Sequence, residues 1–146
     1  MALTAKEKGD AKRGRELFAR QGCVACHTTS AEETPKGPFL GGIATRYSRA
    51  ELCESILQPN AKIAQGFETQ WFKTRDDEEM EGFVTREGGD DLDVRNIVGL
   101  TTTLAKKNIA ERGKRETSMM PVGLADKLTP SELAALLAFL ESSKAK

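Results

Sequence analysis

The sequence predicts a mainly α-helical domain into which a small antiparallel β-sheet is inserted. Three stretches, residues 10–21, 48–58 and 128–142, have the apolar periodicity and the capping residues of helices. Between residues 67 and 115 the pattern changes to short alternating runs separated by Asp- and Gly-rich turns. A length of 146 residues suits one domain better than two. We therefore expect a single domain over residues 1–146 with a β-rich insertion at 67–115.

The first helix should begin after Asp10, whose side chain can cap it, and end before Gly22. Its apolar face includes Phe18 and lies beside Gly14, where the missing side chain lets another helix approach closely. The last helix has a wide apolar face rich in leucine. We expect the first and last helices to cross near Gly14 and to bring the two ends of the domain together.

The other helix starts are marked by capping boxes. Ser48 and Glu51 form one before the middle helix, and Thr129 and Glu132 form one before the last. Cys53 lies among apolar residues of the middle helix. We interpret it as a small buried residue rather than a reactive thiol.

Four or five strands are expected in the insertion. The candidate runs are 69–74, 81–85, 92–97, 101–104 and the segment around Ile109. Trp71, Phe72 and Phe83 are interpreted as core residues of the sheet rather than as an aromatic anchor for a partner. The acidic run at residues 76–79 lacks the spacing of a calcium loop and is interpreted as an exposed hairpin tip.

The composition gives little reason to expect nucleic acid or a membrane as a partner. Lys+Arg and Asp+Glu both number 22, so the formal net charge is zero. No apolar run reaches the roughly eighteen residues that a membrane span needs. Aromatic residues are only 5% of the chain and hydrophobic residues 38%. This share of hydrophobic residues is below the usual one for a globular domain.

The segment Cys23-Val24-Ala25-Cys26-His27 has the spacing that attaches c-type haem. Each thiol can form a thioether to a haem vinyl group, and the adjacent imidazole can reach the iron from one face. A zinc site needs four ligands, whereas the chain offers one further cysteine and no second histidine. A thioredoxin-like dithiol is disfavoured because the motif does not open a βαβ pattern.

Residues 37–42, Gly-Pro-Phe-Leu-Gly-Gly, follow as a candidate second part of the site. Proline has no amide hydrogen but keeps its carbonyl, so the Pro38 carbonyl can accept the proton of the second ring nitrogen of His27. Leu40 would then pack against the porphyrin. The alternative is a turn with no link to the iron. Arg46 and Tyr47 are candidates to bond the haem propionates, or else ordinary surface residues.

The second axial ligand has to come from elsewhere, because His27 is the only histidine. A six-coordinate iron would take sulfur, lysine or solvent there, and a methionine thioether raises the reduction potential. Met119 and Met120 are adjacent and cannot both reach one metal. We predict Met120, because Pro121 rigidifies the backbone beside it. The predicted iron ligands are therefore His27 and Met120.

Together these features resemble the class I cytochrome c family, over residues 9–66 and 116–143. The attachment motif is the specific part of the resemblance. It implies a helical cytochrome c fold around one haem c bound covalently through Cys23 and Cys26. It also implies one-electron transfer through an exposed haem edge.

The insertion departs from ordinary small cytochromes c. With the patterns at 52–67 and 118–124, it is similar to the haem-binding domains at the C-terminal ends of large exported planctomycete- and verrucomicrobia-type proteins. In that group the domain often follows a sugar-dehydrogenase-like propeller or other modules. This resemblance implies an electron-accepting domain of a larger protein.

We expect an electron carrier rather than an enzyme, with a redox protein or a fused dehydrogenase module as partner. The alternative is a haem enzyme or a gas or peroxide sensor whose distal methionine is labile or absent. A peroxidase would need a distal acid-base helper, for which only Arg112 or Arg115 stand out. Haem c is attached outside the cytoplasm in bacteria, so we expect a periplasmic or otherwise exported location, with a signal or parent chain beyond this sequence. The sequence does not predict an oligomeric state.

Overall fold

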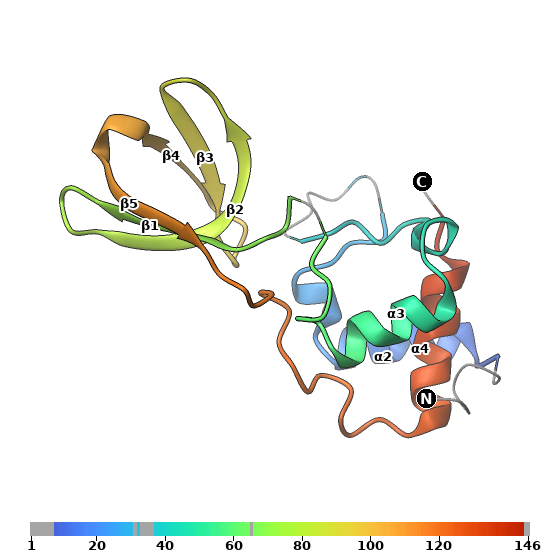
Figure 1. Cartoon of the computed structure of the whole chain (residues 1–146). Helices are drawn as coiled ribbons and strands as arrows, with labels where there is room; N and C mark the ends of the chain where they lie inside the picture. The colour runs from blue at the N-terminus through green and yellow to red at the C-terminus, as the bar shows by residue number, and fades with distance from the viewer. Residues whose placement is uncertain (1–7, 31, 33–36, 65, 145–146) are drawn as a thin grey trace. The chain divides into compact units, whose positions relative to one another are not determined.

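The computed structural model describes residues 8–30, 32, 37–64 and 66–144. The chain divides into two compact units (Figure 1). Unit 1 consists of Met1–Lys62 and Pro121–Lys146, and unit 2 is the continuous segment Ile63–Met120. Unit 1 contains the α-helices, and unit 2 contains a β-sheet. None of the helices in the described residues is long and apolar enough to cross a membrane.

Helices α2 (Ala11–Arg20) and α4 (Pro130–Ser142) form the central contact of unit 1. Asp10 caps α2 by accepting a hydrogen bond from Lys12 N at 3.0 Å. A Cβ atom added to Gly14 would lie only 1.9 Å from the carbonyl oxygen of Ala135. Only glycine therefore permits this close approach of the two backbones, and the predicted crossing at Gly14 is confirmed.

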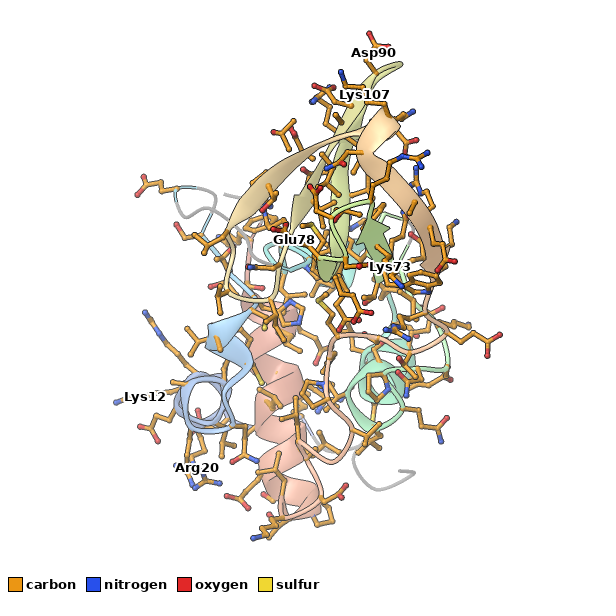
Figure 2. All side chains as sticks on the ribbon, turned by 90° about the vertical axis from the view of Figure 1, so that its left-hand side faces the viewer. Lys12, Arg20, Lys73, Glu78, Asp90 and Lys107 are labelled. Carbon is orange, nitrogen blue, oxygen red and sulfur yellow. The ribbon has the colours of Figure 1, made fainter. Side chains whose placement is uncertain are left out.

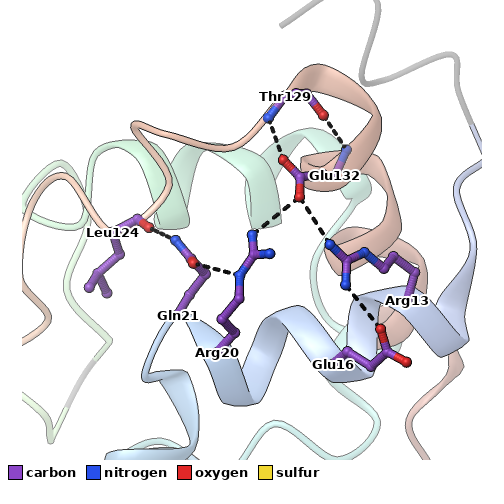
Figure 3. A network of polar contacts seen from close by, with 7 residues as sticks. All are labelled: Arg13, Glu16, Arg20, Gln21, Leu124, Thr129 and Glu132. Atoms are coloured by element: carbon purple, nitrogen blue, oxygen red, sulfur yellow. Dashed lines mark hydrogen bonds and ion pairs between the residues drawn. The ribbon is translucent and has the colours of Figure 1, made fainter.

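A polar network joins the same two helices (Figure 3). The carboxylate of Glu132 accepts a hydrogen bond from the backbone N–H of Thr129, completing the predicted capping box. Its other oxygen pairs with Arg13 at 3.3 Å and Arg20 at 3.2 Å. The hydrogen bond from Thr129 N and then the hydrogen bond from Arg20 lower the pKa of Glu132. The carboxylate of Glu132 thus caps α4 and forms ion pairs with α2. Lys12, also on α2, extends away from α4 (Figure 2).

Helix α3 (Arg49–Leu57) completes the helical unit and begins with the predicted Ser48–Glu51 capping box. Arg49 forms an ion pair with Glu141 on α4. Cys53 is 5% exposed, so its interpretation as a buried residue is confirmed. The core of unit 1 contains buried residues from all three helices and from the segments between them: Phe18, Ile43, Leu52, Cys53, Ala125, Leu133, Leu136, Leu137 and Leu140.

We predict that Gly14→Ala destabilises unit 1 by about 1–3 kcal/mol, because the added methyl group has no room against the Ala135 backbone. The measurement is urea unfolding of the haem-loaded protein followed by far-ultraviolet circular dichroism. Gly89→Ala is the control, since a Cβ there meets nothing within 4 Å. Equal unfolding midpoints for the two variants would contradict the predicted packing constraint.

Unit 2 is a five-stranded antiparallel sheet with the strand order β4-β3-β2-β1-β5 (Figure 1). The strands are β1 (Gln70–Thr74), β2 (Glu79–Glu87), β3 (Asp91–Arg95), β4 (Thr101–Ala105) and β5 (Ile109–Lys114). A 3₁₀ helix, Lys106–Asn108, connects β4 to β5. Helices account for 31% of the described residues. The expectation of a mainly α protein therefore has to be corrected: it describes unit 1 only, because the insertion carries a complete sheet.

The sheet has a hydrophobic core of its own, made of Phe72, Leu92, Val94 and Leu104. Phe72 is 1% exposed, and the guanidinium of Arg112 lies 5.1 Å from the centre of its ring. The core interpretation of Phe72 and Phe83 is confirmed, since both are buried. Trp71 is half-buried and lies against Gly113. Unit 2 thus buries Phe72 and Phe83, whereas Trp71 stays partly exposed.

Charged side chains on the strands form ion pairs across the sheet. Glu87 on β2 pairs with Arg112 on β5 at 3.1 Å and with Lys106 at 3.0 Å. Arg86 pairs with two aspartates on β3. Asp90 and Lys107 lie together at one end of the unit (Figure 2). The acidic turn 76–79 is exposed, as expected for a hairpin tip.

The carboxylate of Glu87 gives unit 2 a predicted dependence on acid. Hydrogen bonds from Arg112 and Lys106 lower the pKa of Glu87 from 4.5 to about 2. Because the folded-state pKa lies below the unfolded value, the stabilisation is present above pH 4.5 and is lost as the pH falls towards 2. We expect carbon NMR of the Glu87 carboxyl group to give a midpoint near 2. Glu87→Gln should remove this part of the acid dependence, and a midpoint near 4.5 would contradict the assignment.

Candidate functional site

The attachment motif follows α2 directly and is held in a compact turn. Gly22 has φ = 83°, a left-handed conformation that favours glycine and ends the helix. A 3₁₀ helix, Cys23–Ala25, comes next, and the backbone N–H groups of Cys26 and His27 both donate to the Cys23 carbonyl, at 3.2 and 2.9 Å. Cys23, Cys26 and His27 are half-buried. The motif therefore projects its three functional side chains from a short, hydrogen-bonded segment.

A hydrogen bond fixes the imidazole of His27. Its Nδ1 lies 2.7 Å from the carbonyl oxygen of Pro38, the pair of atoms that the sequence suggested. A carbonyl can only accept, so Nδ1 carries the proton and Nε2 has the lone pair. Next to it, Leu40 N donates to the Thr28 carbonyl at 2.9 Å. These two bonds align residues 27–28 with residues 38–40.

Burial affects the ionisation of the site. It lowers the pKa of His27, against the opposing effect of the hydrogen bond to Pro38, so the ring is neutral at neutral pH. Burial also raises the pKa of the Cys23 thiol. A neutral imidazole with Nε2 available is the form of histidine that ligates iron.

The segment that carries Pro38 is fastened to the end of α4. Gly42 N donates to the Ser143 carbonyl at 3.0 Å, and the Ser143 hydroxyl donates to the Leu40 carbonyl at 3.2 Å. Gly37 lies against Cys26, where an added Cβ would be 3.2 Å from the Cys26 carbonyl oxygen. Leu40 is half-buried and packs against the core of unit 1.

The segment after the methionine pair is joined to the end of α2. The side-chain amide of Gln21 donates to the Leu124 carbonyl at 2.6 Å (Figure 3). Gln21 is two residues before Cys23, and Leu124 is four residues after Met120. This contact connects the two parts of the chain from which the sequence predicts iron ligands.

The remaining predicted site residues differ in their surroundings. Arg46 and Tyr47 have exposed side chains and lie just before the cap of α3. Met119 and Met120 are half-buried and belong to unit 2, where Met120 N donates to the Ser118 hydroxyl at 3.1 Å. His27, Pro38 and Leu40 are brought together in unit 1.

Sequence reasoning did not single out Thr28. It is buried, and its hydroxyl has no hydrogen-bond partner among the described residues. Such a group is costly to bury alone. In the sequence, only its position directly after His27 indicates a role in the site, because burial is known only for the folded chain. A buried hydroxyl that lacks a partner beside two thiols and a neutral imidazole fits a site completed by a bound group.

Comparison with known proteins agrees with this geometry. The family model for cytochrome c matches residues 11–100. This chain therefore belongs to the cytochrome c family. It carries one covalently bound haem c, with iron as its metal, and serves haem-based electron transfer. None of the curated proteins compared with it gives a significant match.

The residues of unit 1 fit this cofactor. The two half-buried thiols have the spacing of thioether attachment, the ring of His27 has its Nε2 available, and the hydroxyl of Thr28 lacks a partner. These residues would hold the haem through two covalent bonds and one iron bond.

Cysteine substitutions test the assignment of the attachment residues. We predict that replacing both Cys23 and Cys26 by Ser leaves any bound haem extractable by acidified organic solvent, whereas the unaltered protein keeps it after denaturation. Cys53→Ser is the control and should retain covalent haem, because Cys53 is a buried core residue outside the attachment motif. Haem staining of denaturing gels measures the difference. Loss of covalent haem from Cys53→Ser alone would contradict the assignment.

Proposed function

We propose that this chain is a one-electron carrier whose haem iron is ligated by His27 and Met120. The observation that carries the proposal is the hydrogen bond from His27 Nδ1 to the Pro38 carbonyl. When bound, the haem supplies an iron that exchanges single electrons. We further propose that electrons arrive from a dehydrogenase, either a separate protein or a fused module, in a periplasmic or otherwise exported location.

The fixed imidazole suits a ligand that stays in place during electron transfer. The bond to Pro38 holds the tautomer and the orientation of His27, and the bond between Leu40 and Thr28 keeps that carbonyl in position. Pro38 has no N–H group of its own. The chain's only histidine is thus oriented with Nε2 available to bind iron.

Three features support Met120 as the second ligand. The chain has no second histidine. Met120 precedes the segment that Gln21 fastens to the end of α2 through Leu124. Met119 lines a cavity within unit 2, which gives its side chain a different environment. We therefore assign Met120 rather than Met119.

The two arginines considered for a peroxidase role form ion pairs with glutamates of unit 2. Arg112 pairs with Glu87 at 3.1 Å and lies over Phe72. Arg115 pairs with Glu81 at 3.1 Å. Both contacts lie within unit 2 and support a carrier without a distal acid-base helper. The resemblance to C-terminal haem domains of larger exported proteins supports a fused or closely associated electron donor.

Substitution of each methionine in turn tests the ligand assignment. We predict that Met120→Ala abolishes the weak far-red absorption band of iron–methionine bonding. It should also lower the reduction potential by a sizeable part of the roughly 0.8 V range that axial ligands span. Met119→Ala is the matched control and should keep both properties. Visible spectroscopy and potentiometry are the measurements.

The opposite pattern would reassign the ligand to Met119. A high-spin spectrum in the unaltered protein, with ready binding of carbon monoxide or cyanide, would instead favour the haem enzyme or sensor.

A further inference from the structure

A second site is suggested by a cavity of about 280 Å³ in unit 2. It lies at the end of the sheet where β1 begins and β5 ends. Thr69 directly precedes β1, Arg115 directly follows β5, and Asn96 directly follows β3. Ile97 and Met119 contribute apolar lining. The described residues that line it all belong to unit 2.

Thr69 in the cavity lining is unusual because it is a polar residue that is almost completely buried. It is 3% exposed, and its hydroxyl has no hydrogen-bond partner among the described residues. Its backbone is satisfied, because the Thr69 carbonyl accepts a hydrogen bond from Arg115 N at 2.8 Å. A buried hydroxyl without a partner is unfavourable unless another group completes it. The cavity is where such a group would be bound.

The cavity has a surplus of hydrogen-bond donors. Arg115 Nε donates to Glu81 at 3.1 Å, but its two terminal nitrogens have no acceptor within the described parts of the chain. The side-chain oxygen of Asn96 accepts from Val98 N and Leu100 N, at 3.1 and 3.0 Å. The Asn96 NH₂ group therefore remains a donor, and no described residue accepts from it. Among the described residues of the lining, Glu81 is the only one with a negative charge.

We propose that this cavity binds a carboxylate group, with Arg115 as the charged partner and Thr69 and Asn96 as neutral donors. A carboxylate oxygen pair matches the fork of a guanidinium and can accept further hydrogen bonds. A single arginine whose charge is partly compensated by Glu81 suits a singly charged anion. The carboxylate is that of a small acid in solution.

Substitution of Glu81 tests the direction of the change in carboxylate affinity as well as its size. Its carboxylate competes with the ligand for the same guanidinium. Removing that competitor should strengthen binding, whereas removing Arg115 should abolish it. A cavity that only stores solvent would respond to neither change in this way.

The experiment titrates acetate into the reduced, haem-loaded full chain. Binding is measured from the shifts of the backbone amide NMR signals of Thr69, Asn96 and Arg115. Acetamide is the uncharged control probe. We expect Arg115→Gln to weaken acetate binding by at least tenfold, and Thr69→Val by about fivefold, the loss expected for one neutral hydrogen bond. Glu81→Gln should tighten binding severalfold.

Lys114→Gln is the matched control, because it removes the same charge one residue away, outside the cavity lining. It should leave acetate binding unchanged.

Two results would overturn the proposal. If acetate does not bind the unaltered protein, or if Arg115→Gln and Lys114→Gln bind acetate equally well, the proposal is wrong. The NMR readout does not require methionine ligation, so failure here and failure of the proposed function are separable.

Discussion

The bond between His27 Nδ1 and the Pro38 carbonyl is the contact on which the site in unit 1 depends. The chain has one histidine, and that bond determines which of its nitrogens can face a metal. The carbonyl is itself held, because Leu40 bonds to Thr28 on one side and to Ser143 on the other. The orientation of one ring can thus be followed through hydrogen bonds to the end of α4. A site arranged in this way changes little when an electron arrives or leaves.

The contact between α2 and α4 provides the base for this arrangement. Gly14 brings the backbones together, and Glu132 adds charged contacts to both arginines on the facing side of α2. The attachment cysteines follow α2 after a single left-handed glycine, so their position is determined by where that helix packs. Gln21, the residue before this glycine, also holds the Leu124 carbonyl. The two halves of unit 1, far apart in sequence, are therefore joined beside the motif.

The sequence was sufficient for features that depend on local chemistry. Helix caps, strand and turn patterns, the close approach at Gly14 and the bond between His27 and Pro38 could all be predicted from neighbouring residues or from one motif. The bond from Gln21 to Leu124 could not, because no pattern predicts which glutamine will meet a carbonyl 103 residues away. The unpartnered hydroxyls of Thr28 and Thr69 could not be predicted either. They matter because they are buried, and burial is known only once the chain is folded.

The structure of unit 2 explains how a helical domain can accommodate so long an insertion. Strands β1 and β5 are neighbours in the sheet, with Gln70 opposite Lys114, and Arg115 N bonds to the Thr69 carbonyl at 2.8 Å. The chain therefore enters and leaves the sheet at adjacent points. An insertion whose ends lie side by side imposes little separation on the segments that it interrupts, and the cost of closing a loop rises only slowly with its length. The sheet also buries a hydrophobic core of its own. The insertion can thus acquire a binding role of its own while the haem-attachment motif keeps its local geometry.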